Sequence, residues 1–103
     1  MRAATARLRP PVHPGHILKE DLLEPLGISV NKLATELGVP ANRLSQIVNA
    51  RRAITPDTSL RLGRFFGFTP EYWHNMQRRY DFELVRRSSE AEIARAVHPR
   101  RAA

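Results

Sequence analysis

The stretch from Ser29 to Asn49 constrains the fold more than any other part of this 103-residue chain. Its apolar residues recur at the intervals of one face of an α-helix, on each side of a glycine. Gly38 stands where the chain must leave the first helix, and a left-handed backbone costs glycine little. Ala34 is small, so two crossing helices can approach closely there. The pattern predicts two short helices whose inner faces consist of Leu33, Ala34, Leu37, Val39, Leu44 and Ile47.

Both predicted helices carry start signals. Ser29 can cap the first helix with its hydroxyl group. Pro40 fits the first position of the second helix, where no N–H is needed. A small residue, a glycine corner and these starts are together typical of a helix-turn-helix. Because any two amphipathic helices joined by glycine share part of this pattern, a simple αα-hairpin is the alternative.

The outward face of the second helix favours DNA binding. Its side chains are of the types that recognise base edges, because arginine pairs with guanine, asparagine and glutamine pair with adenine, and alanine or serine can approach a thymine methyl group. The face has no carboxylate, whereas a merely solvated helix would more often mix Glu with Lys. The predicted base-reading residues are Ala41, Asn42, Arg43, Ser45 and Gln46.

Basic residues are concentrated on and just after this second helix. The chain has 17 Lys+Arg against 10 Asp+Glu, a formal net charge of +7. Residues 40–64 contain five arginines and a single carboxylate, Asp57, whereas residues 14–38 contain two lysines and four carboxylates. We expect such a basic segment to lie along phosphates. Arginine outnumbers lysine, which suits phosphate and guanine, although a GC-rich genome would give the same bias.

No strand pattern competes with the helical periods, so we predict an all-α fold of five to six helices. A first helix is expected over 14–26, ended by Gly27. A fourth helix is expected after Thr55, which caps it ahead of Pro56. The side chains expected to face the core from these two helices are Ile17, Leu18, Leu22, Leu60, Leu62 and Phe66.

Thr69 and Pro70 repeat the same start for a fifth helix. The tail over 81–97 is either another helix or a continuation of the fifth, ended at His98–Pro99. We therefore divide the chain into a flexible basic arm (1–12), a helix-turn-helix DNA-binding domain (13–83) and a C-terminal helix with a basic tail (84–103).

All seven aromatic residues lie between positions 65 and 82. Core packing is the expected role of Phe66 and Trp73. The remaining aromatic residues exceed what a core of this size needs, and exposed apolar area usually marks an interface. Since helix-turn-helix proteins bind as two-fold dimers, we predict a dimer interface containing Phe68, Tyr72, Tyr80 and Phe82.

Composition argues against several classes of protein. The chain has no cysteine, which excludes a disulfide framework and a thiolate zinc site. It has no apolar run of membrane-spanning length and no secretory h-region, so we expect a cytoplasmic, nucleoid-associated protein without a membrane partner. His13, His16 and Glu20 stand near one another, but surface histidines at a helix start explain them better than a metal site. We expect no metal, no cofactor and no catalytic residue, hence no enzyme.

Three segments resemble the HigA family of antitoxins, within the XRE/Cro-like helix-turn-helix superfamily. They are HPGHILKEDLLEPLGIS, NKLATELGVPANRLSQIVNARRAITPDTSLRLGRFFG and TPEYWHNMQRRYDFE, which together span 13–83. The resemblance implies a bundle of the lambda-repressor/XRE-like type. It also implies an antitoxin that binds double-stranded operator DNA as a homodimer, represses its own operon and neutralises a RelE/HigB-like ribonuclease toxin.

The resemblance also implies roles for single residues. The part of the recognition helix that enters the major groove in this superfamily matches Asn42, Arg43, Ser45 and Gln46. Phosphate contacts are implied for Asn31, Lys32, Asn49, Arg51, Arg52 and Thr55. The chain departs from the family at Val30, where many members have glutamine, and at His16, where an acidic residue is common. Gly63 replaces a usual alanine inside a helix, at about 1 kcal/mol of helix propensity.

Two other functions fit part of the sequence. The first is a stand-alone transcriptional repressor of the same fold without a toxin partner. The sequence does not separate this from an antitoxin, whereas the identity of the adjacent gene would. The second is a small basic ribonuclease toxin, which the missing strands and the absence of a His/Glu/Arg cluster argue against.

Overall fold

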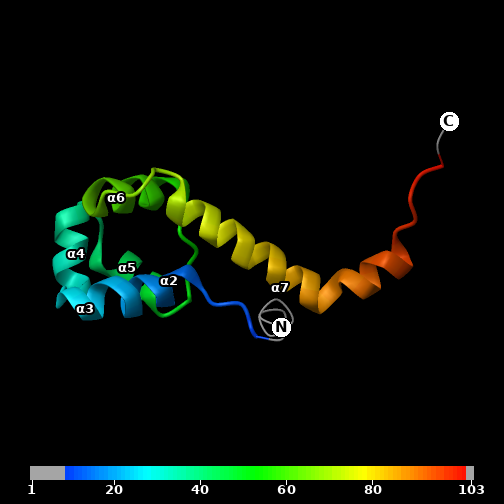
Figure 1. Ribbon diagram of the computed structural model, residues 1–103, viewed down its shortest axis with the longest axis horizontal. Coiled ribbons are helices and arrows are strands. Elements are labelled where there is room, and N and C mark those ends of the chain that lie inside the picture. Colours follow the sequence, from blue (N-terminus) through cyan, green and yellow to red (C-terminus); the bar gives the residue numbers. More distant parts are fainter. Residues whose placement is uncertain (1–8, 102–103) are drawn as a thin grey trace.

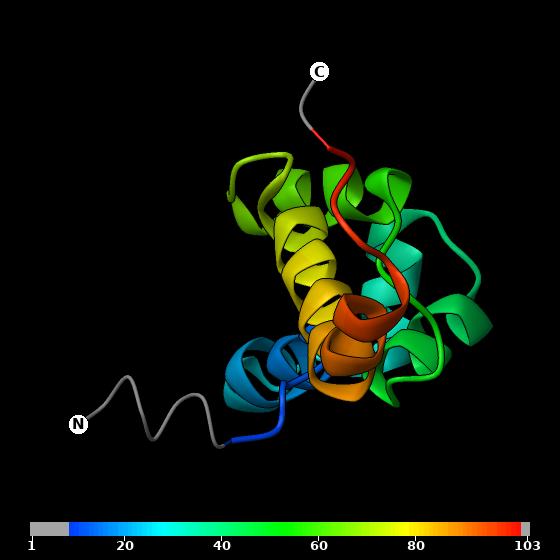
Figure 2. The ribbon, with the colours of Figure 1, turned by 90° about the vertical axis from the view of Figure 1, so that its right-hand side faces the viewer.

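The computed structural model describes residues 9–101, and every regular element in that part of the chain is helical (Figures 1 and 2). The predicted all-α fold is therefore confirmed. Most of the predicted basic arm falls on residues 1–8, which lie outside the described residues. In chain order the elements are α2 (Pro14–Ile17), η1 (Leu18–Leu23), α3 (Glu24–Leu26), α4 (Val30–Leu37), α5 (Ala41–Val48), α6 (Pro56–Phe66) and α7 (Tyr72–Ala96).

One core joins these helices. It confirms the inward faces predicted for α4 and α5, and Trp73 from α7 is its largest fully buried side chain. The side chains partly buried against it include Val30, Val39 and Phe66. The fully buried apolar members are Leu18, Leu23, Leu33, Ala34, Leu37, Leu44, Ile47, Val48, Ile54, Leu62 and Trp73.

Leu60 was wrongly predicted to face the core. Its side chain is 56% exposed, while Leu62 is fully buried. Two residues that are two positions apart on a helix project to nearly opposite sides, so only one of them can face inward. The inward positions before Leu62 are taken by Thr58 and Ser59 instead.

The predicted caps are largely confirmed. The Ser29 hydroxyl accepts a hydrogen bond from the Lys32 amide (3.0 Å), and Thr55 caps α6 through the Thr58 amide. Gly38 takes the left-handed conformation at the end of α4 (φ 69°). Pro40, however, is the extended N-cap residue of α5 (ψ 139°), so the helix begins one residue later than predicted.

The predicted start of the fifth helix at Thr69–Pro70 is wrong by two residues, because α7 begins at Tyr72. The Ser59 hydroxyl explains the difference. It donates to the Pro70 carbonyl (2.6 Å) and accepts from the His74 amide (3.0 Å), which fixes the preceding residues as a turn. The amide of Tyr72 donates to the Thr69 carbonyl across that turn (3.2 Å).

The first helix runs over 14–26 as predicted, but its middle, η1, has π-helical hydrogen bonding. The Glu24 amide donates to the Lys19 carbonyl, five residues back. Pro25 follows directly, and proline lacks an N–H and crowds the carbonyl four positions earlier. A wider turn at this point accommodates the proline without ending the helix.

Two glycines permit close backbone contacts. A Cβ atom at Gly15 would collide with the carbonyl oxygen of Ile47, so α2 can lie against the end of α5 only through glycine. A Cβ atom at Gly63 would press on the carbonyl oxygens of Thr69 and Phe68, at 3.0 and 3.1 Å. The departure from alanine at position 63 is therefore explained by the tight return of the chain after α6.

Helix α7 is a single helix of 25 residues, so the tail over 81–97 continues the fifth helix (Figure 1). Its first turns lie on the domain, and its only buried residues are Trp73 and Gln77. From Phe82 onward all residues of the helix are exposed except Glu83 and Ser89, which are half-buried. This second half projects away from the other helices (Figure 1). The predicted boundary between residues 83 and 84 falls inside this helix.

Candidate nucleic-acid interface

Helices α4 and α5 form the helix-turn-helix pair. The Val39 amide donates to the Ala34 carbonyl (3.0 Å), which closes the turn between the helices. On α5, Leu44, Ile47 and Val48 are buried, and this leaves the polar side of the helix free to contact a partner.

The polar side of α5 contains a strip of four side chains. Asn42 and Asn49 are exposed, and Ser45 and Gln46 between them are half-buried. Their spacing of three and four residues places them on one line along the helix. We call Asn42, Ser45, Gln46 and Asn49 the polar strip of α5. The other two predicted base-reading residues, Ala41 and Arg43, lie on its flanks.

Arg43 does not point freely to solvent. Its guanidinium forms an ion pair with Asp57 of α6 (3.2 Å), and the same carboxylate oxygen accepts from Arg61 (2.9 Å). The one carboxylate of residues 40–64 thus holds two of the five arginines. Ion pairs of this exposed kind contribute little stability and exchange readily, so Arg43 remains available to a stronger anion.

Arg61 has a structural role that the charge pattern did not indicate. It donates to the carbonyl of Leu37 at the end of α4 (2.8 Å), one of the carbonyls that a helix end leaves without a partner. Arg61 was counted only as part of the basic segment, and no role of its own was predicted for it. Its partner is a backbone atom far along the chain, and composition carries no signal for such a contact.

The predicted phosphate residues after α5 lie on an exposed loop. Helix α5 ends with Ala50 in a left-handed conformation (φ 59°), and the Arg51 amide donates to the Gln46 carbonyl (2.8 Å). This is the hydrogen bond of a Schellman motif, with alanine where glycine is usual. Arg51 and Arg52 are exposed directly after it. The side-chain Nδ2 of Asn49 donates to the Ser45 carbonyl, one turn back on α5 (2.8 Å).

The other predicted phosphate residues lie at two helix N-termini. Asn31 and Lys32 are exposed in the first turn of α4, and Lys32 pairs with Glu36 (3.0 Å). Thr55 caps α6 and lines a hollow of about 360 Å³ beside α5. That hollow brings Thr55 together with Arg43 and Arg52, so three of the predicted DNA-contacting residues lie in one place.

His13 is buried, with 6% of its surface exposed, and the prediction of a surface histidine is wrong for it. Its Nδ1 accepts a hydrogen bond from the Gly15 amide (2.8 Å) and thereby caps α2. Burial lowers the pKa of His13 from 6.5, with a further decrease from nearby His16; Asp81 and the Arg52 backbone act in the opposite direction. Within residues 9–101 no group of three His, Asp or Glu side chains could hold a metal ion.

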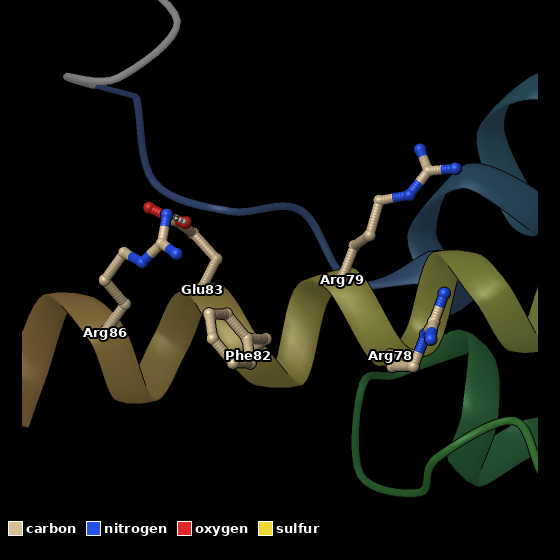
Figure 3. Close-up of a pocket in the computed structure, with 5 residues that line it drawn as sticks. All are labelled: Arg78, Arg79, Phe82, Glu83 and Arg86. Atoms are coloured by element: carbon tan, nitrogen blue, oxygen red, sulfur yellow. Dashed lines mark ion pairs between the residues drawn. The ribbon is translucent and has the colours of Figure 1, made fainter. Parts of the chain in front are cut away.

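A second hollow lies along α7 (Figure 3). Its volume is about 510 Å³, and it is lined by Arg78, Arg79, Phe82, Glu83 and Arg86. The guanidinium of Arg86 lies over the Phe82 ring, 5.0 Å from its centre, and pairs with Glu83. These contacts keep the exposed aromatic side chain covered by a cation on one side.

The four predicted dimer residues do not form one continuous surface. Phe68 and Tyr72 stack on each other (4.7 Å between ring centres) at the start of α7. Tyr80 is half-buried and packs edge-on against His13 (5.0 Å). Phe82 is two residues further along the helix and therefore projects to nearly the opposite side from Tyr80. Only Phe82 belongs to the projecting half of α7.

No helix within the described residues is long and apolar enough to cross a membrane.

Comparison with known proteins finds a matching family model, similar sequences and similar solved structures. A helix-turn-helix family model matches residues 18–73. Virulence-associated protein I of Dichelobacter nodosus is 43% identical over 82 residues, which cover 80% of this chain and 76% of that protein. A solved addiction module antidote protein of the HigA family from Coxiella burnetii is 44% identical, with a TM-score of 0.82 over 89% of this chain and 100% of that one. Antitoxin HigA of Pseudomonas aeruginosa, solved with the higBA promoter, is 34% identical, with a TM-score of 0.83 over 86% and 97% of the two chains.

Proposed function

This chain belongs to the HigA family of helix-turn-helix proteins, and on that premise we propose that it is a sequence-specific DNA-binding antitoxin that represses its own operon as a dimer. We further propose that it neutralises a RelE/HigB-like ribonuclease toxin. The relative from Pseudomonas aeruginosa was solved with promoter DNA, which supports the DNA-binding half of the proposal.

The polar strip of α5 is the observation that carries the proposal. Asn42 and Gln46 can pair with adenine, and Arg43 can exchange Asp57 for a guanine edge or a phosphate. Arg51 and Arg52 on the following loop supply backbone contacts, and the N-termini of α4 and α6 present Asn31, Lys32 and Thr55 to phosphate. Base readers and phosphate contacts thus lie on α5 and the elements that adjoin it.

The second half of α7 supports the dimer. Phe82, Val85 and Ile93 are all exposed, and their spacing, with Ser89 between them, places them on one line along the helix. A two-fold pair of such helices would bury this stripe and would present two recognition helices to two DNA half-sites. Phe68 and Tyr72 provide a second exposed aromatic area on the same protein.

Salt dependence tests the phosphate contacts. We expect Arg51→Ala and Arg52→Ala to weaken binding to every duplex about equally, and each to reduce the slope of log affinity against log salt by about one. Arg95→Ala removes the same charge from the far end of α7 and should change neither quantity. Loss of preference for one sequence alone, with an unchanged salt slope, would show that these arginines do not contact phosphate.

Co-purification tests the toxin partner. The chain is co-expressed with the product of the adjacent gene, with and without residues 1–9 and with and without residues 86–103. We expect a stable complex and relief of ribonuclease toxicity by the full chain. If the adjacent gene encodes no ribonuclease, or its product does not bind, the protein is a stand-alone repressor of the same fold.

A further inference from the structure

The loop Ala50–Ile54 follows the recognition helix and presents Arg51 and Arg52. It is held from beneath by a buried side chain of α7. Gln77 is almost fully buried, and its Oε1 accepts a hydrogen bond from the Ile54 amide (2.9 Å). The amide nitrogen of Gln77 donates in turn to Asp81 (2.9 Å). One hydrogen bond thus ties the end of the loop to α7, and a second bond within α7 holds the Gln77 side chain in place.

His13 lies at the same junction of α2, this loop and α7. Its Nδ1 caps α2 through the Gly15 amide, and Gly15 is the residue whose backbone lies against the Ile47 carbonyl of α5. The His13 ring packs edge-on against Tyr80 of α7 at 5.0 Å. The Arg52 backbone is among the groups that act on the His13 imidazole, so the ring lies beside the loop. His13 therefore contacts the elements that fix where α5 ends and where the loop begins.

We propose that His13 is a positioning residue for the DNA-contacting loop, and that its neutral imidazole is the form that holds the loop for DNA binding. This inference rests on the proposed function, because the consequence it names is a change in DNA affinity. The reason is geometric. A neutral ring offers an unprotonated Nδ1 to the Gly15 N–H, whereas protonation places a second donor there and removes the cap.

The groups that face His13 determine when this change occurs. His16 disfavours protonation, while Asp81 and the Arg52 backbone favour it, and the Tyr80 ring packs edge-on against the imidazole. Burial has the largest effect, so the pKa of His13 lies below 6.5 and the ring is neutral at pH 7. Protonation of His13 accordingly begins only in mild acid.

The test compares DNA affinity across pH for the wild type and His13→Asn. Asparagine is a strong N-cap and does not titrate in this range. Binding is measured by fluorescence anisotropy at fixed salt between about pH 8 and pH 5, on the duplex upstream of the chain's own gene. We expect the wild type to lose about five- to tenfold in affinity relative to His13→Asn as the pH falls. Superimposable profiles would overturn the inference.

His16→Asn is the matched control. His16 is exposed, so its substitution removes a neighbour that lowers the pKa of His13 without removing the cap. Loss of its positive charge makes His13 easier to protonate, so the acid transition should remain and should move to higher pH. A transition that disappears in this variant would assign the effect to His16 and contradict the proposal.

A second measurement separates this inference from the proposed function. Amide resonances of Arg51, Arg52 and Ile54 are followed by NMR during a pH titration of the free protein. They should shift with the His13 ring in the wild type and stay unchanged in His13→Asn. If the folded wild type binds no duplex at pH 8, the proposed function fails, whereas the NMR titration still tests the coupling. Loop resonances that do not follow His13 would overturn the coupling itself.

Discussion

The two halves of α7 both contain apolar residues but have opposite surroundings. In the first half Trp73 is 1% exposed and Gln77 is buried beneath the loop after α5. In the second half Phe82 is 64% exposed, and Val85 and Ile93 are exposed with it. Trp73 and Phe82 lie on nearly opposite sides of one continuous helix, so the apolar face changes side near the middle of α7. The first face completes the core, and the second has no partner within residues 9–101.

The second half is also held together differently. Its described contacts are ion pairs within one or two turns, such as Arg87 with Glu83 (2.9 Å) and Arg86 with Glu90 (3.6 Å). Each pair of this kind contributes roughly 0.3–0.5 kcal/mol. A short helix without tertiary packing is marginal in water. The first half is therefore stabilised by the fold, while the second has only contacts along its own helix within residues 9–101.

The largest loss of stability is expected at Gly15, where the backbones of α2 and α5 are in close contact. Gly15→Ala would drive a Cβ atom into the Ile47 carbonyl, and we expect a loss of about 3 kcal/mol of unfolding free energy. Urea denaturation measures this loss. Gly27→Ala is the control, because its Cβ would meet nothing, and the left-handed backbone there (φ 66°) should cost only about 1 kcal/mol. Equal losses would contradict the close contact of α2 with α5.

A pair of substitutions, one in each half of α7, sharpens the comparison. Gln77→Leu leaves the buried Ile54 amide without an acceptor and should destabilise the domain by about 2 kcal/mol. Leu84→Gln changes an exposed position and should alter the unfolding free energy by less than about 0.5 kcal/mol. A large loss from the second substitution would show that the projecting half packs on the domain.

The assembly is tested by Phe82→Ser. If the stripe of Phe82, Val85 and Ile93 is the dimer contact, removing this ring should cost about 1.5 kcal/mol of association, or about tenfold in the dimer dissociation constant. Sedimentation equilibrium measures it, with Leu84→Ser on the other side of the helix as control. A monomeric wild type, or equal weakening by both variants, would remove α7 as the dimer contact.

The smallest expected effect is a pH dependence of stability that comes from the packed domain alone. Because burial and His16 lower the pKa of His13 in the folded protein, the unfolded chain binds its proton more tightly. Stability is then complete above about pH 6.5 and falls as the pH decreases toward the folded-state pKa. Thermal unfolding should show a shallower decline for His13→Asn. A steeper decline would mean that protonated His13 is stabilised by the fold.

Local patterns predicted the helix-turn-helix, and long-range contacts account for what was missed. The face of α4 and α5, the Ser29 and Thr55 caps and the Gly38 corner are all determined within a few residues, so periodicity and capping chemistry were sufficient. The contact of Arg61 with Leu37 was not predicted because the two residues lie far apart along the chain, and His13 was wrongly placed on the surface because its burial depends on tertiary packing.

Other features had signals in the sequence that were not used. The spacing of Phe82, Val85 and Ile93 indicates a second apolar face on α7, and the two-residue separation of Leu60 and Leu62 already excludes one of them from the core. The ion pair of Arg43 with Asp57 had no such signal, because it joins two helices whose packing the sequence alone does not give.

The affinity of the Gln46→Ala variant for the duplex upstream of the gene tests the central claim most directly. Gln46 lies in the middle of the polar strip of α5 and is half-buried, and its side chain has no hydrogen-bonding role in the described part of the fold. At fixed salt we predict a loss of about 1–3 kcal/mol in binding, with an unchanged urea midpoint and little change on an unrelated duplex. An unchanged dissociation constant on the upstream duplex would contradict the assignment of α5 as the helix that reads DNA.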